Sequence, residues 1–118
     1  MDNLTKLNLL YDYYGDFLTS KQREIFELYY VHDLSLGEIA EQSGITRQGV
    51  YDVVRRSQKA LKGFEKKLGM VNKHFAMEKK LKKILVALKE IEPGVTDEYR
   101  RNFYHILDEV TKLLEGSG

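Results

Sequence analysis

The chain has 118 residues, of which 42% are hydrophobic and 31% charged, a balance typical of a folded globular protein and not of a disordered one. Its net charge is only +1, and it contains no cysteine, which excludes disulfides and thiolate metal sites. The N-terminus carries acids and no basic segment, and no apolar run approaches the ~18 residues that span a bilayer, so we predict a cytoplasmic protein without signal peptide or membrane span.

Helical spacing of apolar residues predicts two helices at the start of the chain. The first carries leucines and tyrosines from Leu4 to Tyr14 and ends at Gly15. The second begins at a cap supplied by Thr19 or by Ser20. Its apolar face consists of Ile25, Phe26, Leu28 and Tyr29.

Two further helices are predicted around a short turn. Ser35 caps the first of them, and Glu38, three residues later, completes a capping box. Gly44 ends that helix, since glycine adopts the left-handed conformation at little cost. Thr46 caps the next helix.

The second half of the chain is also helical. The pattern continues from Phe64 to Ile91, with a break at Gly63 or at Gly69, and the stretch EPGVTDE then interrupts it before a last helix over residues 97–114. The expected fold is all-α. We predict a helix-turn-helix domain over residues 1–62, a C-terminal helical dimerisation segment over residues 63–115, and a tail over residues 116–118.

The middle of the chain has the spacing of a helix-turn-helix. Ala40 provides the small residue where two helices cross, and Gly44 provides the turn. Apolar residues that would fix the crossing angle are Ile39, Ile45, Val50 and Val53. A plain helical hairpin that buries its own core is the alternative.

Polar side chains follow the outward face of the second helix of this pair. Those able to hydrogen-bond base edges or phosphates are Arg47, Gln48, Tyr51, Asp52 and Arg55. Arg56, Lys59 and Lys62 extend the positive charge toward the C-terminal end of the helix and suit contacts to a nucleic-acid backbone.

Charge is unevenly distributed along the chain. Residues 1–44 carry three Lys/Arg and eight Asp/Glu, a net −5. Residues 45–89 carry thirteen and three, a net +10, and residues 90–118 carry three and seven, a net −4. The basic middle indicates an anionic partner better than the whole-chain balance does, although a solvated helix face is the alternative explanation.

The stretch from Leu18 to Leu61 resembles the region 4 helix-turn-helix of bacterial sigma factors, which recognises promoter DNA. Nearly the whole chain resembles the YlxM family of Gram-positive bacteria, which is typically encoded beside the signal recognition particle GTPase and implies a role in that pathway. By this resemblance the polar residues from Arg47 to Arg55 occupy recognition-helix positions. Glu24 and Glu27 are acidic residues at positions where a sigma factor often has basic ones. The other sigma regions, which hold core polymerase, are missing, so the chain is not expected to be a sigma factor itself.

No catalytic or metal-binding pattern is present in the sequence. His32, His74 and His105 lack the spacing of zinc ligands, and there is no glycine-rich phosphate loop. The tyrosines at helical spacing are expected in the core and not as stacking platforms for bases. We therefore predict a protein that is not an enzyme and that uses no cofactor or metal.

Two functions remain open from the sequence. The first is a DNA-binding regulatory protein with a role in the signal recognition particle pathway. The alternative is an adaptor that contacts signal recognition particle RNA or its GTPase and does not bind DNA. The sequence pI near 7.9 keeps this alternative open, because about 9 or more is typical of DNA-binding domains.

A heptad rhythm in the penultimate helix predicts a homodimer through residues 64–115. The seam consists of Met77, Leu81, Ile84, Leu88 and Ile91, with Leu85 and Val86 beside it. The last helix offers a second apolar face formed by Tyr99, Phe103, Ile106, Leu107, Val110 and Leu114. Packing of these two helices on each other within one chain is the alternative.

Overall fold

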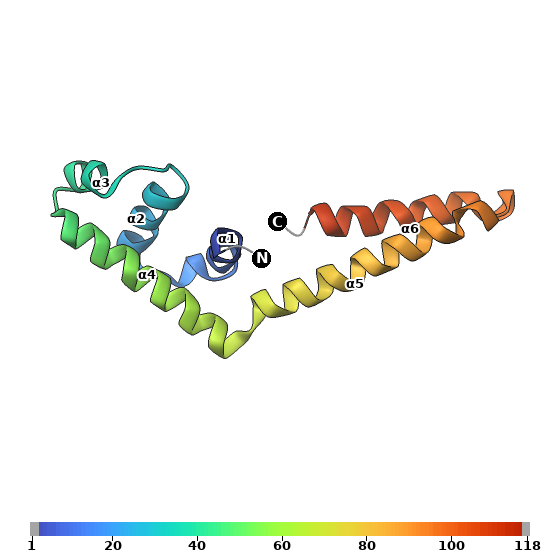
Figure 1. Cartoon of the computed structure of the whole chain (residues 1–118), viewed down its shortest axis with the longest axis horizontal. Helices are drawn as coiled ribbons and strands as arrows, with labels where there is room; N and C mark the ends of the chain where they lie inside the picture. The colour runs from blue at the N-terminus through green and yellow to red at the C-terminus, as the bar shows by residue number, and fades with distance from the viewer. Residues whose placement is uncertain (1–2, 117–118) are drawn as a thin grey trace. The chain divides into compact units, whose positions relative to one another are not determined.

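The structure, a computed structural model, describes residues 3–116, and the regular secondary structure within them is entirely helical. The expected all-α class is therefore confirmed. The chain divides into two compact units, one up to Val71 and one from Asn72 onward, and each is described by itself (Figure 1). The domain boundary predicted between residues 62 and 63 lies inside a helix and remains a prediction. Across residues 3–116, no helix is both long and apolar enough to cross a lipid bilayer.

The first unit begins with two helices and a connecting turn of 3-10 helix. These elements are α1 (Asn3–Tyr14), η1 (Gly15–Phe17) and α2 (Ser20–Tyr30). They are followed by α3 (Leu36–Ser43) and α4 (Arg47–Leu68). The helices α5 (Met70–Ile91) and α6 (Asp97–Glu115), with η2 (Glu92–Gly94) between them, complete the chain.

The predicted helix caps are present in the first unit. Thr19, not Ser20, caps α2, and its side chain forms a reciprocal capping box with Gln22. Ser35 and Glu38 form the predicted capping box of α3, and the Thr46 hydroxyl accepts a hydrogen bond from the Gly49 amide at 2.9 Å. These caps satisfy amide groups that have no partner inside the helix, so local sequence sets where each helix begins.

The core of the helix-turn-helix lies between α2, α3 and α4. Ile25, Ile39, Val50 and Val54 form one buried cluster. Ala40 and Ile45 pack against it, as expected for a small residue at the helix crossing and an apolar residue in the turn. A second group of fully buried side chains ties α1 and the end of α4 to the unit: Leu10, Tyr14, Phe26, Leu61 and Val71.

A hydrogen-bond network joins α1 to the junction of α4 and α5. The Tyr14 hydroxyl donates to Glu65 Oε1 at 2.6 Å and accepts from the Met70 amide at 3.0 Å. The Val71 amide also donates to Glu65 Oε1, at 2.9 Å. Burial, together with the hydrogen bond to Glu65, raises the pKa of Tyr14 above its ordinary value. The break between α4 and α5 lies at Gly69, which has a positive φ of 65°, and Gly63 is an ordinary helical residue inside α4.

Two glycines of this unit should respond oppositely to alanine. Gly44 has a φ of 68°, where a β-carbon is strained, whereas Gly63 is helical; a β-carbon at either would contact nothing within 4 Å beyond the adjoining backbone. We therefore expect Gly44→Ala to lower the free energy of unfolding by about 1 kcal/mol. Gly63→Ala should raise it by about 0.5–1 kcal/mol through helix propensity. Urea titrations of both variants test this, and equal effects would contradict the backbone explanation.

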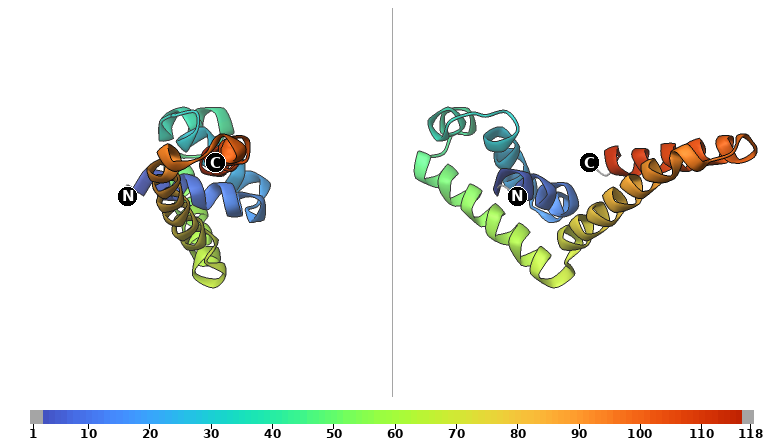
Figure 2. Two further views of the ribbon diagram at one scale, coloured as in Figure 1. Left: turned by 90° about the vertical axis from the view of Figure 1, so that its right-hand side faces the viewer. Right: turned by 45° about the vertical axis from the view of Figure 1, so that its right-hand side comes forward.

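The second unit is a helical hairpin in which α6 returns along α5, as the views in Figures 1 and 2 agree. Phe103 and Val110 of α6 are buried, and on α5 the half-buried leucines are Leu81, Leu85 and Leu88. Packing within one chain, the alternative to a dimer seam, therefore occupies part of the predicted apolar faces. Met77, Ile84 and Ile91 stay exposed, and so does Val86 on another side of α5.

Candidate nucleic-acid interface

The turn between α3 and α4 has the backbone of a helix-turn-helix. Gly44 is left-handed, and the amides of Gly44 and Ile45 both donate to the Ala40 carbonyl, at 3.0 and 3.3 Å. Ile45 then turns inward to the core, and Thr46 starts α4. The chain thus reverses in three residues and presents the N-terminal end of α4 next to α3 (Figure 1).

One face of α4 is buried and the opposite face is polar. The buried positions are Val50, Val54, Ser57 and Leu61. The polar positions follow the same 4-3-4-3 spacing on the other side of the helix: Gln48, Asp52, Arg55, Lys59 and Lys62. We call these five residues the α4 stripe. Asp52 is half-buried and the other four are exposed.

The remaining predicted residues flank the α4 stripe. Tyr51 is 48% exposed on one side, and Arg56 is exposed on the other. Arg47 is also exposed, but its guanidinium lies over Gly37 of α3, where an added β-carbon would come within 2.9 Å of it. The structure therefore brings all eight predicted residues to the outer surface of α4, with Arg47 directed toward the neighbouring helix.

The two ends of the α4 stripe differ in charge. At the N-terminal end the Gln48 amide donates to Asp52 Oδ1 at 3.1 Å, which holds both side chains in one arrangement. Next to this pair, a depression of about 300 Å³ is lined by Asp52, Arg55, Arg56 and Lys59. Hydrogen-bonding groups thus precede a run of positive charge along a single helix.

The N-termini of α3 and α4 present opposite electrostatics. Glu38 lies in the first turn of α3, and its hydrogen bonds with Ser35, first of all with the Ser35 backbone, hold the pKa of its carboxyl below the usual value. This negative charge already interacts with the α3 dipole. The first turn of α4 has no acid. An approaching anion is therefore favoured at α4 and disfavoured at α3.

Two features were missed by sequence reasoning. Lys66, four residues after Lys62, continues the α4 stripe by one turn, and helical spacing alone could have found it. The contact between Arg47 and Gly37 joins residues on different helices, and no pattern in the sequence predicts it.

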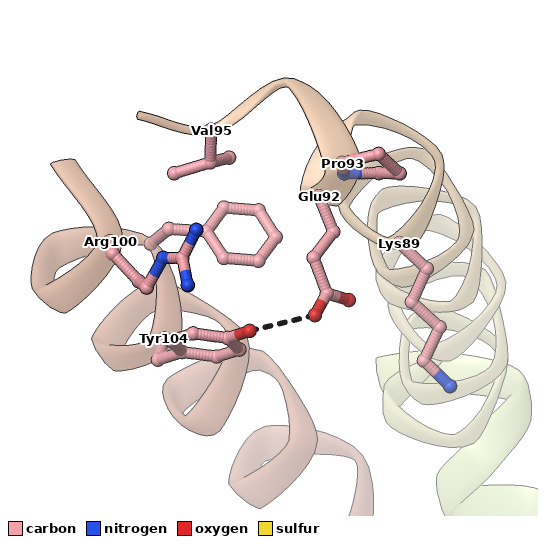
Figure 3. A pocket seen from close by; sticks show the side chains of 7 residues that line it. Lys89, Glu92, Pro93, Val95, Arg100 and Tyr104 are labelled. Carbon is pink, nitrogen blue, oxygen red and sulfur yellow. Dashed lines mark hydrogen bonds between the residues drawn. The ribbon is translucent and has the colours of Figure 1, made fainter. Parts of the chain in front are cut away.

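A hollow also lies at the closed end of the α5–α6 hairpin. It has a volume of about 320 Å³, and Figure 3 shows Tyr104 donating a hydrogen bond to Glu92 there, at 2.8 Å. That bond raises the pKa of Tyr104. The Tyr104 hydroxyl and the Glu92 carboxylate are hydrogen-bonded to each other. This pair therefore stabilises the turn between α5 and α6, and we assign the hollow no ligand. Among residues 3–116, no group of three or more His, Asp or Glu side chains is placed to hold a metal ion.

Comparison with known proteins identifies the family. A family model described as "UPF0122: Putative helix-turn-helix protein, YlxM / p13 like" matches residues 1–101. A UPF0122 protein of Caldanaerobacter subterraneus is 55% identical over 83 residues, which cover 70% of this chain and 71% of the relative. A UPF0122 protein of Thermoanaerobacter sp. is 44% identical over 97% of this chain and 95% of its own length, and the UPF0122 protein YlxM of Bacillus subtilis is 36% identical over 98% and 93%. The resemblance to the YlxM family is thus confirmed, and the chain belongs to the UPF0122 family of YlxM-like helix-turn-helix proteins.

Proposed function

We propose that the protein is a regulator that binds DNA in a sequence-specific way through α4. The observation that supports this most is the α4 stripe, in which a hydrogen-bonding end leads into a basic end on the side of the helix opposite the core. A major groove admits one α-helix, and the residues near its N-terminus would lie closest to the base edges.

The stripe offers a division of roles along the helix. Gln48, Asp52 and Arg55 carry the side chains that can read bases, because Gln pairs with adenine, Asp accepts from cytosine and Arg donates to guanine. Lys59 and Lys62 lie one to two turns further along, where a straight helix leaves the groove and approaches the phosphates. Tyr51 and Arg47 would contact the groove wall beside α3.

Substitutions along the stripe should separate these roles. We expect Arg55→Ala to weaken binding to a selected site by ~1–3 kcal/mol. Arg47→Ala should have an effect of the same size, because the wild-type guanidinium would leave Gly37 to contact the DNA. Lys59→Ala should weaken binding to all sequences alike and reduce the salt slope by about one, because one phosphate contact is lost. Fluorescence anisotropy with sites selected from a random DNA pool, at several salt concentrations, measures both effects.

Lys21→Ala provides the matched control, since Lys21 is an exposed basic residue on α2 and lies outside the α4 stripe. It should leave both affinity and salt slope unchanged. If binding to the selected site were the same for the Arg47 and Arg55 variants as for the wild type, the assignment of α4 as the reading helix would be wrong.

We further propose that this binding serves the signal recognition particle pathway, a role that rests on the family resemblance. The second candidate is an adaptor that contacts the particle's RNA or its GTPase. The acids Asp52 on α4 and Glu38 at the start of α3 favour the GTPase as the contact, because they would repel the phosphates of DNA and of RNA alike. A pull-down from lysate with and without nuclease separates the two: partners lost with DNase support the regulator, and partners that survive both DNase and RNase support a protein-binding adaptor.

A further inference from the structure

Two rows of large apolar side chains remain exposed on the α5–α6 hairpin. On α5 they are Met77 (58% exposed), Ile84 (47%) and Ile91 (58%). On α6 they are Tyr99 (58%), Ile106 (50%) and Leu113 (57%). Within each row the residues are seven apart, which is two helical turns, so each row runs straight along its helix.

Both rows lie on the same side of the hairpin. Ile84 directly precedes the inward-facing Leu85 on α5, and Ile106 directly precedes the inward-facing Leu107 on α6, so each row is rotated from the packed face in the same sense. The helices α5 and α6 run in opposite directions (Figures 1 and 2). An equal rotation about two antiparallel helices therefore brings both rows to one side of the hairpin. We call these six residues the hairpin face.

The three layers of the hairpin face are in register. At the closed end of the hairpin Lys89 of α5 lines the same hollow as Arg100 and Phe103 of α6. Counting equal numbers of residues from there along the two antiparallel helices places Ile84 level with Ile106. By the same count Met77 is level with Leu113, and Ile91 with Tyr99. Six large side chains, each about half exposed, amount to an apolar patch on the order of 500 Å², a size at which patches on monomers often mark an interaction site.

We propose that a second copy of the chain covers the hairpin face, so that two hairpins form an antiparallel four-helix bundle. Two copies of the patch bury about 1,000 Å² in total, which reaches the lower limit for a specific interface. Three layers with equal spacing on both helices are self-complementary under a two-fold rotation, as an interface between identical subunits requires. This proposal is independent of what α4 binds.

Charges beside the hairpin face select which helices meet. Lys80 stands three residues after Met77 and four before Ile84, and Glu109 stands three after Ile106 and four before Leu113. When α5 packs against the partner's α6, Lys80 and the partner subunit's Glu109 both lie between the same two layers and pair. If α5 packed against the partner's α5 instead, Lys80 would lie opposite Ala87 of the partner subunit, and the charges would have no counterpart. Complementary charge therefore favours α5 against the partner's α6.

Sedimentation equilibrium of the full chain tests the dimer. We expect the wild type at micromolar concentration to show twice the 13.8 kDa of one chain. Ile84→Lys, at the central layer, should weaken dimerisation by roughly 30-fold or more. Val86→Lys is the matched control, because Val86 is 57% exposed on the same helix but points away from the hairpin face; this variant should dimerise like the wild type. Circular dichroism verifies that each variant is folded.

Charge reversal tests the arrangement. Lys80→Glu and Glu109→Lys should each weaken the dimer several-fold, and the double variant should regain wild-type association. A wild-type species at 13.8 kDa would overturn the proposal, as would a dimer lost with Val86→Lys and kept with Ile84→Lys. A double variant no stronger than the single ones would overturn the pairing of α5 with the partner's α6.

Discussion

Replacing Phe26 with alanine is expected to lower the free energy of unfolding of the first unit by about 3–5 kcal/mol. Phe26 is 1% exposed and lies between two tyrosine rings. It stacks on Tyr11 with ring centroids 4.6 Å apart and contacts Tyr30 at the same centroid distance. Removing it opens a cavity that rigid helices on both sides cannot fill, and domains of this size have only about 5–15 kcal/mol of stability in total.

Chemical denaturation followed by circular dichroism measures this loss, with Phe17→Ala as control. Phe17 is 63% exposed and contacts Phe64 in the same unit, with ring centroids 5.3 Å apart. Its removal should cost less than about 1 kcal/mol. Similar losses for the two variants would mean that the aromatic stack around Phe26 is not the centre of this core.

Replacing Glu65 with alanine is expected to lower the free energy of unfolding by about 2–4 kcal/mol. Glu65 Oε1 accepts from both the Tyr14 hydroxyl and the Val71 amide. Without this carboxylate, two donors in a part-buried place lose their acceptor. The loss of stability should be large for a single polar substitution, because the variant removes a charged acceptor and leaves two donors without a hydrogen-bond partner.

Two further variants separate the acceptor role from charge alone. Glu65→Gln keeps a carbonyl oxygen for the same donors and should recover part of the loss. Glu24→Ala removes an exposed carboxylate of α2 and should change stability by no more than ~0.5 kcal/mol. Hydrogen exchange of the Val71 amide provides a local readout, and unchanged protection in Glu65→Ala would contradict the role assigned to this residue.

The helix starts were predictable because their signals are local. Ser35 with Glu38, and Thr46 before α4, each lie within three residues of the amides that they cap, so sequence neighbours decide the outcome. The break between α4 and α5 was not decided by local signals, since both Gly63 and Gly69 could end a helix. The break lies at Gly69, where Tyr14, far away in the chain, hydrogen-bonds Glu65 on one side of the junction and the Met70 amide on the other.

The sequence predicts a heptad rhythm in α5, but it does not show which side of that rhythm faces α6. Leu81 and Leu88 belong to two overlapping sets with the same spacing, one that includes Ile84 and one that includes Leu85. Only the position of α6 shows that Leu85 faces inward and Ile84 outward. The stripe on α4 followed from periodicity in the same way, whereas the direction of Arg47 depends on a different helix.

Gly37 matters because it lacks a side chain, and not because its backbone needs a conformation that only glycine adopts easily. It lies in the first turn of α3 and leaves open the space that the Arg47 guanidinium occupies. A larger residue at this position would push the arginine outward without altering any residue of α4. The direction of a charged side chain on one helix is thus set by a neighbour on another, so the exposed surface of α4 can change without any substitution in α4 itself.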